Sequence, residues 1–220
     1  MRKTDILKRI KEIGLLPVLR ASSAGEALAL AEAIAEGGIS AIEVTMTVPG
    51  AVEVIETLIR QTGDRILIGA GTVLDPETAR ACMLAGAAFI VSPSLNLRTI
   101  EICHRYSVPV IPGALTPTEV VTAWEAGADI VKVFPCSAMG GAKYLKALKA
   151  PFPQIELIPT GGVSLATAAE FLAAGAFALG VGADLVDPQA IVAGTPEVIT
   201  QNARKYVELV RAAQALPGTT

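Results

Sequence analysis

Lys132 is the residue whose type and setting point most directly to chemistry. It stands in Asp129-Ile-Val-Lys-Val-Phe134, a run that is otherwise apolar after its first residue. On a β-strand its side chain would share a face with Ile130 and Phe134, because side chains alternate between the two faces. Burial disfavours the charged ammonium, and a neutral amine attacks carbonyl groups to form a Schiff base. The alternative is a structural lysine, either paired with a carboxylate or reaching solvent from the strand's end.

Glu43 is the second polar residue in an apolar strand pattern, within Ala41-Ile-Glu-Val-Thr45. A carboxylate at the end of a strand can move protons, directly or through a water molecule. The alternative is a purely structural ion pair with Lys132 or Arg20. The two interpretations overlap, because a catalytic lysine and a nearby carboxylate would also attract each other.

Two glycine-rich turns and one arginine are candidates for binding an anionic substrate. The turns are Pro159-Thr-Gly-Gly162 and Gly180-Val-Gly-Ala183. Glycine lets the backbone come close to an anion, whose charge is then met by N–H groups. Arg20 follows an apolar run and could hold a carboxylate or phosphate by a bidentate contact. The alternatives are ordinary turns and a surface arginine.

The elements that must position these residues alternate regularly along the chain. Helical stretches such as Ala24–Glu36, Pro76–Ala85 and Pro117–Ala126 separate short β-rich runs, and such alternation favours a parallel sheet. Eight runs are expected as strands: Leu15–Leu19, Ala41–Thr45, Ile66–Ile68, Phe89–Val91, Val108–Ile111, Ile130–Phe134, Glu156–Ile158 and Phe177–Val181. We therefore predict a single (β/α)8 TIM barrel, with a doubly wound open sheet as the alternative.

In such a barrel the active site forms at the C-terminal ends of the strands. The polar, aromatic and turn residues expected there include Arg20, Glu43, Thr45, Thr47, Thr72, Pro93, Lys132, Phe134, Gly161, Gly162, Gly182 and Ala183. Thr72 offers a hydroxyl and a backbone amide, although it also precedes a helix start at Asp75-Pro76. Phosphate sites often form at the last two strands of this fold, where both glycine turns fall.

The boundaries of the chain's elements are marked by caps and glycines. Thr4 is expected to cap a leading helix that Gly14 ends, so residues 1–14 form an extra N-terminal helix. Proline at the first helical position predicts helix starts after Asp75 and Thr116. Gly37, Gly86, Gly127 and Gly175 are expected to end helices in a left-handed conformation. We expect one domain over residues 1–220, with a frayed tail at 216–220.

Composition excludes several classes of protein. The chain is 52% hydrophobic and 18% charged with a net charge of -3, so neither disorder nor binding to nucleic acid or an anionic membrane surface is expected. No apolar run reaches the length of a membrane span. Cys82, Cys103 and Cys136 form no CxxC pair and are expected as reduced thiols in a cytoplasmic protein. They and His104 give no converging ligands, so no metal site is expected.

Eight motifs, in their order and spacing, resemble the class I aldolases of the Entner–Doudoroff type, which act on 2-keto-3-deoxy-6-phosphogluconate (KDPG) and 4-hydroxy-2-oxoglutarate. The resemblance covers about Leu15 to Val210. The motifs are Pro17-Val-Leu-Arg20, Ile42-Glu-Val-Thr45, Ile68-Gly-Ala-Gly-Thr-Val73, Val91-Ser-Pro93, Pro112-Gly113, Val131-Lys-Val-Phe-Pro135, Gly141 to Lys149 and Pro159-Thr-Gly-Gly162.

The resemblance implies a (β/α)8 barrel, a homotrimer, and neither metal nor cofactor. It implies that Lys132 forms the Schiff base and that Glu43 is the acid/base carboxylate. The implied binding residues are Arg20, Thr72 and Pro93 for the carboxylate, and Gly161, Gly162 and the Gly182-Ala183 turn for the phosphate. The implied reaction cleaves KDPG to pyruvate and glyceraldehyde 3-phosphate, and 4-hydroxy-2-oxoglutarate to pyruvate and glyoxylate.

Two positions depart from the resembled family. Some members have a substrate-contacting arginine where this chain has Thr47, and we infer that Arg20 supplies the cation instead. Some members have a phosphate-binding serine where this chain has Ala183, so phosphate would rely on backbone amides. The alternatives are 2-keto-3-deoxy-6-phosphogalactonate cleavage, isomerisation or decarboxylation of a phosphorylated sugar, and a non-catalytic barrel that binds a phosphorylated ligand.

Overall fold

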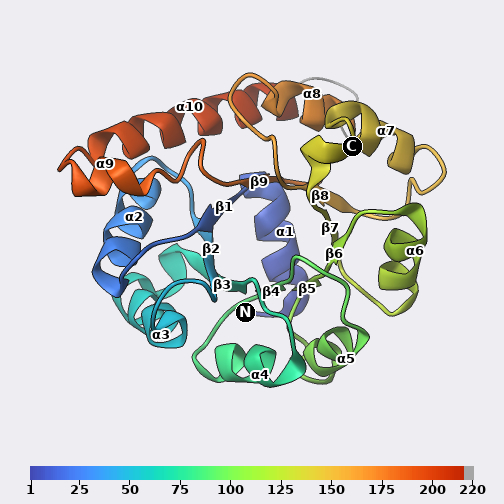
Figure 1. Ribbon diagram of the computed structural model, residues 1–220, viewed down its shortest axis with the longest axis horizontal. Coiled ribbons are helices and arrows are strands. Elements are labelled where there is room, and N and C mark those ends of the chain that lie inside the picture. Colours follow the sequence, from blue (N-terminus) through green and yellow to red (C-terminus); the bar gives the residue numbers. More distant parts are fainter. Residues whose placement is uncertain (216–220) are drawn as a thin grey trace.

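The computed structural model describes residues 1–215 and consists of parallel strands surrounded by helices (Figure 1). Six strands form one sheet in the order β5-β4-β3-β2-β1-β9, and three form a second in the order β6-β7-β8. The strands are β1 (Leu15–Leu19), β2 (Ala41–Thr45), β3 (Leu67–Gly71), β4 (Ile90–Val91), β5 (Val110–Ile111), β6 (Gly113–Ala114), β7 (Val131–Val133), β8 (Leu157–Pro159) and β9 (Leu179–Val181). The expected α/β class with a parallel sheet is confirmed.

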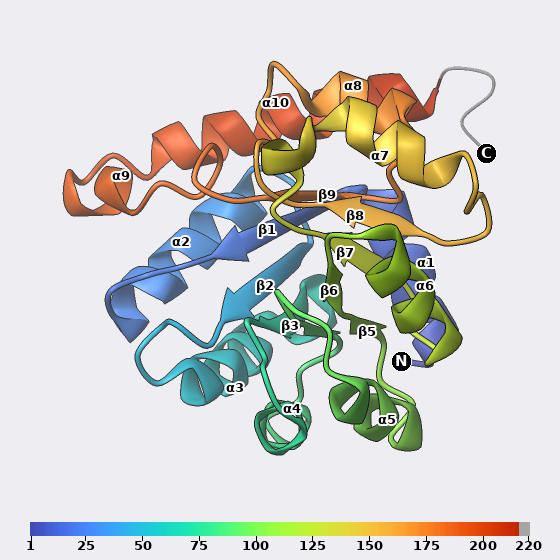
Figure 2. The same ribbon diagram turned by 45° about the vertical axis from the view of Figure 1, so that its right-hand side comes forward.

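Helices follow the strands in the expected alternation, and Figures 1 and 2 show them arranged around the strands. They are α1 (Lys3–Ile13), α2 (Ala24–Glu36), α3 (Ala51–Thr62), α4 (Pro76–Leu84), α5 (Leu97–Arg105), α6 (Pro117–Glu125), α7 (Ala142–Lys149), α8 (Ala168–Ala173), α9 (Pro188–Val192) and α10 (Glu197–Gln214), with short 3-10 turns at Gly63–Arg65 and Cys136–Met139. Within residues 1–215 no helix is both long and apolar enough to cross a membrane.

Two apolar clusters divide the strand residues by the face on which they lie. The larger cluster lies between strands and helices and contains Ile42, Val44, Val131 and Val133. The smaller cluster contains residues of opposite parity, among them Ile130, together with apolar residues of α1. Since side chains alternate along a strand, Glu43 and Lys132 must point to the side away from the surrounding helices.

Helix α1 packs against the smaller apolar cluster through Ile6 and Ile10. An ion pair between Lys3 Nζ and Asp129 Oδ1, 2.8 Å apart, holds its first turn beside the start of β7. Gly14 ends the helix with a φ of 66°, as expected. The expected cap at Thr4 was wrong, because the helix begins at Lys3 with Arg2 in the N-cap position and no side-chain cap.

Other predicted boundaries hold where side chains cap the helices. Asp75 accepts a hydrogen bond from the amide of Thr78, and Thr116 forms a capping box with Glu119. Gly86, Gly127 and Gly175 have φ values of 95°, 92° and 90° directly after helix ends. Gly37 was predicted wrongly: it has a φ of -73°, and the left-handed residue after α2 is Gly38, with a φ of 94°.

The expected strand Val108–Ile111 is shortened to β5, and the short strand β6 follows it; β5 pairs with β4, and β6 pairs with β7. Pro112 lies between the two segments, and proline has no N–H with which to continue a ladder. At the other junction an isolated parallel bridge joins Thr160, just after β8, to Gly180 of β9. The two sheets are therefore adjacent in the chain on one side and bridged on the other. The expected frayed tail at 216–220 lies outside the described residues.

Candidate active site

Lys132 and Glu43 meet although they lie on different sheets. Lys132 is on β7 and Glu43 is on β2, and their Nζ and Oε1 atoms are 3.5 Å apart. The residues are only 5% and 1% exposed. The structure thus brings together the two residues that the sequence singled out, in a buried pair that is compatible with both a catalytic and a structural role.

A cavity of about 470 Å³ lies beside this pair, at the C-terminal ends of β1, β7, β8 and β9. Phe134 connects it to the lysine, because Lys132 Nζ lies 5.5 Å from the centre of the Phe134 ring. Six of the predicted site residues line this cavity: Arg20, Phe134, Gly161, Gly162, Gly182 and Ala183. Residues from four strand ends therefore share one space next to the buried amine.

The two glycine turns line the cavity and contain backbone amides without a partner in the described residues. Gly161 and Gly162 have φ values of 90° and 76°, which residues with a side chain rarely adopt. A Cβ on Gly162 would also lie 2.5 Å from Cβ of Ser137. Within residues 1–215 the amides of Gly162, Gly182 and Ala183 donate to no protein acceptor. Unpaired N–H groups in turns that line one cavity suit an anion.

Thr45 connects the ends of β1 and β2. Its buried hydroxyl donates to the carbonyl of Leu19 at 3.0 Å and lies 2.6 Å from the hydroxyl of Thr47. Arg20 follows Leu19 directly, so its backbone stands beside the strand end that carries Thr47. Arg20 is exposed and makes no hydrogen bond or ion pair with any described residue. Its guanidinium is therefore available to an anion.

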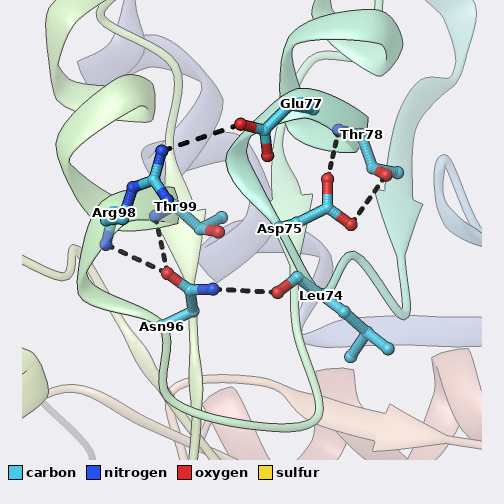
Figure 3. Close-up of polar contacts among 7 residues, drawn as sticks. All are labelled: Leu74, Asp75, Glu77, Thr78, Asn96, Arg98 and Thr99. Carbon is cyan, nitrogen blue, oxygen red and sulfur yellow. Dashed lines mark hydrogen bonds and ion pairs between the residues drawn. The ribbon is translucent and has the colours of Figure 1, made fainter.

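Thr72 and Pro93 lie at the ends of β3 and β4 and are not among the residues that line the cavity. Thr72 has a φ of 57°, which is unusual for a β-branched residue and shows that its surroundings fix it. Figure 3 shows how the following segments are connected: the Asn96 side-chain amide donates to the carbonyl of Leu74 at 2.9 Å. Asn96 also caps α5, so the loops after β3 and β4 are held together.

The three cysteines and His104 do not form a metal centre in the described part of the chain. All three thiols are buried and free. Burial raises the pKa of Cys136, which follows β7, to about 11, so this thiol stays protonated near neutral pH. His104 is exposed on α5, and its Nε2 contacts the carbonyl of Gly127.

Sequence reasoning missed Asp184, which also lines the cavity. Its Oδ2 accepts hydrogen bonds from the hydroxyl of Tyr206 and from the amide of Leu165, the latter at 3.3 Å. Aspartate is an ordinary surface residue, so the residue type gave no indication of a role in the site. Its position two residues after Gly182 was the only available indication.

Known proteins resemble this chain over nearly its whole length. The family model "KDPG and KHG aldolase" matches residues 6–202. A 2-dehydro-3-deoxy-phosphogluconate aldolase of Treponema pallidum is 35% identical, covering 93% of this chain and 97% of that protein. A 2-dehydro-3-deoxy-6-phosphogalactonate aldolase of Escherichia coli is 36% identical, covering 91% and 98% respectively.

A solved structure gives the same result for the three-dimensional fold. The KDPG aldolase of Legionella pneumophila, with pyruvate captured as a covalent carbinolamine intermediate, superposes with a TM-score of 0.84 at 32% identity. The match covers 93% of this chain and 97% of that one. Sequence, fold and the buried lysine–glutamate pair agree, and the chain belongs to the KDPG and KHG aldolase family.

Proposed function

We propose that this chain is a class I aldolase that cleaves KDPG to pyruvate and glyceraldehyde 3-phosphate. Membership of an aldolase family makes it a carbon–carbon lyase. The observation that carries the proposal is the buried pair of Lys132 and Glu43 beside a cavity with free backbone donors. We extend the proposal to 4-hydroxy-2-oxoglutarate, which would give pyruvate and glyoxylate.

The proposed mechanism begins with the lysine. Glu43, 3.5 Å away, can accept a proton from Lys132 and leave the neutral amine that attacks the C2 ketone. Glu43 returns this proton to the hydroxyl of the resulting carbinolamine, which leaves as water and gives a protonated imine. The imine then accepts the electron pair of the C3–C4 bond. Glu43, through a water molecule, takes the proton of the C4 hydroxyl, and the aldehyde leaves. The remaining enamine is protonated at C3 with the help of Glu43, and hydrolysis releases pyruvate and restores Lys132.

We assign the two ends of the substrate to two different groups of residues. The carboxylate is met by Arg20, whose backbone adjoins the strand end of Thr47, and by Thr72 and Pro93. The phosphate binds the amides of the β8 and β9 turns, at Gly161, Gly162, Gly182 and Ala183. Phe134 packs against the substrate between the two ends, and Thr45 acts through its hydrogen bonds to the neighbouring strand ends. The imine is the electron sink, so no cofactor or metal takes part.

Similarity to one relative supports a second candidate substrate, 2-keto-3-deoxy-6-phosphogalactonate. The 2-dehydro-3-deoxy-6-phosphogalactonate aldolase of Escherichia coli matches this chain as well as the phosphogluconate aldolase does. The two phosphorylated substrates differ in configuration at C4, where Glu43 would act. Comparing kcat/KM for both epimers and for 4-hydroxy-2-oxoglutarate identifies the preferred substrate.

We further propose that the two sheets close into one (β/α)8 barrel forming a single domain. The continuity of β5 and β6 through Pro112 supports closure on one side, and the Thr160–Gly180 bridge supports it on the other. We also propose a homotrimer in the cytoplasm, in keeping with the family resemblance and the three free buried thiols. Light scattering after gel filtration tests the trimer.

Reductive trapping tests the mechanism. Borohydride reduces an imine, so treatment with pyruvate should add a stable three-carbon adduct to Lys132, which peptide mass spectrometry locates. Lys132→Ala should show neither the adduct nor cleavage. Lys132→Arg should be equally inactive, because a guanidinium stays protonated and cannot attack a carbonyl. An adduct on another lysine, or turnover by either variant above a few per cent of wild type, would show that the assignment is wrong.

A further inference from the structure

One carboxylate oxygen joins three segments at the phosphate end of the cavity. Asp184 Oδ2 accepts from the hydroxyl of Tyr206 on α10 and from the amide of Leu165, which follows the β8 turn. Asp184 itself follows the β9 turn, two residues after Gly182. The oxygen therefore connects the β8 turn, the β9 turn and the last helix.

The buried position of Tyr206 keeps its hydroxyl protonated, so that it donates the hydrogen bond to Asp184. It is 0% exposed, and α10 packs against α2, α8 and β1, so its ring has a fixed position. Burial, and then the hydrogen bond to Asp184, raise the pKa of Tyr206 far above its usual value. The hydroxyl keeps its proton at every pH at which the protein works, and it donates to the carboxylate.

Each turn also has internal hydrogen bonds that make it a stiff unit. On the β8 side, the Thr167 hydroxyl donates to the carbonyl of Gly162 at 2.8 Å, and the amide of Ser164 donates to the Thr167 hydroxyl at 3.0 Å. On the β9 side, the amide of Val186 donates to the carbonyl of Gly182 at 2.9 Å. Because Asp184 links these two stiff turns, the distance between the β8 turn and the β9 turn is fixed.

We infer that Tyr206 and Asp184 position the β8 and β9 turns so that their free amides converge on the substrate's phosphate, which makes Tyr206 a specificity-determining positioning residue. This inference rests on the proposed function. Tyr206 touches neither Lys132 nor Glu43 through any described contact, so it acts only through Asp184 and the turns. Its effect should therefore depend on whether the substrate has a phosphate.

Tyr206→Phe is the appropriate substitution, because it removes only the hydroxyl and keeps the buried ring. With KDPG, KM should rise about fivefold to tenfold, the value of roughly one hydrogen bond, while kcat stays near wild type. With 4-hydroxy-2-oxoglutarate, which has no phosphate, KM and kcat should both stay within twofold of wild type. Equal losses on the two substrates, or no loss on KDPG, would overturn the inference.

Thr200→Val provides a matched control on the same helix. Thr200 is buried on α10 and donates its hydroxyl at 2.9 Å to the carbonyl of Ala33 on α2, away from both turns. The variant loses a comparable hydrogen bond and should lose comparable stability in thermal unfolding, with no change in the ratio of kcat/KM for the two substrates. A change in that ratio like that of Tyr206→Phe would mean that general loosening of α10 is the cause, and the inference would fail.

Variants of Asp184 distinguish positioning from charge. Asp184→Asn keeps an oxygen that can accept from Tyr206 and Leu165, so it should retain a KM for KDPG within about threefold of wild type, whereas Asp184→Ala should match or exceed the loss in Tyr206→Phe. If Asp184→Ala instead lowers KM for KDPG, the carboxylate acts by repelling phosphate and the inference is wrong. Failure of wild type to form the borohydride adduct with pyruvate would refute the proposed function itself, which keeps the two outcomes separate.

Discussion

Glu43 occupies the space into which a side chain on Gly71 would project. A Cβ placed on Gly71 would lie 2.0 Å from Oε1 of Glu43 and 2.3 Å from its Cγ. The two residues stand on neighbouring strands, where Thr45 of β2 pairs with Gly71 of β3. The absence of a side chain at position 71 therefore decides where the proposed acid/base carboxylate lies relative to Lys132.

Gly71→Ala should lower kcat strongly without preventing folding. The added methyl must push the Glu43 carboxylate from its place 3.5 Å from Lys132, and a displacement of ~1 Å at a catalytic group can cost ~10²-fold in rate. Steady-state kinetics with KDPG measure the effect. Gly25→Ala is the control, because nothing lies within 4 Å of a Cβ at Gly25. Unchanged kcat in Gly71→Ala would show that the carboxylate tolerates displacement.

Glu43→Gln should impair turnover far more than it impairs pyruvate binding. The amide has nearly the same shape but cannot accept the C4 hydroxyl proton, and general acid–base groups contribute ~10²–10⁴-fold. The fall in kcat measures the effect on turnover, and the yield of the borohydride adduct with pyruvate measures the effect on pyruvate binding and imine formation. A variant whose only defect is a higher KM would place Glu43 in binding and not in catalysis.

The sequence singled out Lys132 and Glu43, the two residues of the buried pair, because they break a pattern. A lysine and a glutamate in otherwise apolar strands are visible without a structure, and so are strands such as β1 and β2, whose bounds match the prediction. The pairing of Glu43 with Gly71, and of Asp184 with Tyr206, could not be predicted. Both contacts join residues that are far apart in the sequence, and only the packing of elements brings them together.

The predicted bounds of one strand were wrong because a proline interrupts the apolar run there. The run Val108–Ile111 was expected as one strand, but pairing starts at Val110, and Pro112 interrupts the ladder before Gly113. The role of Gly113 was also not visible from sequence. A Cβ there would lie 2.2 Å from the carbonyl carbon of Pro93, so glycine lets the loop after β4 approach β6.

Alkaline pH should destabilise the protein through its cysteines. Burial raises the pKa of Cys82 to about 11 and that of Cys103 to about 12, whereas a thiol in an unfolded chain has a pKa of ~8.5. The unfolded state thus releases protons first, so the stability due to the neutral buried thiols is complete below pH ~8.5 and is lost as the pH rises toward 11. Melting temperatures from pH 7.5 to 10.5 measure the loss.

Cys103→Ala supplies the control for the pH effect. Its melting temperature should be lower at pH 7.5, because buried volume is lost, but it should fall less steeply with pH than that of wild type. The buried thiols should also resist iodoacetamide at pH 8 until the protein is unfolded. A wild-type melting temperature that stays constant up to pH 10.5 would contradict the assignment of these thiols as buried neutral groups.

Arg20→Ala tests which end of the substrate the exposed guanidinium meets. Arg20 lines the cavity of the glycine turns, yet its backbone adjoins the strand end that carries Thr47. If it binds the carboxylate, as proposed, the substitution should weaken KDPG, 4-hydroxy-2-oxoglutarate and pyruvate alike, by about tenfold or more for a lost charged hydrogen bond. Arg20→Lys should recover part of the loss, because the charge returns without the bidentate geometry. A defect confined to KDPG, with adduct formation from pyruvate unchanged, would instead make Arg20 a phosphate ligand and leave the carboxylate to Thr72 and the neighbouring amides.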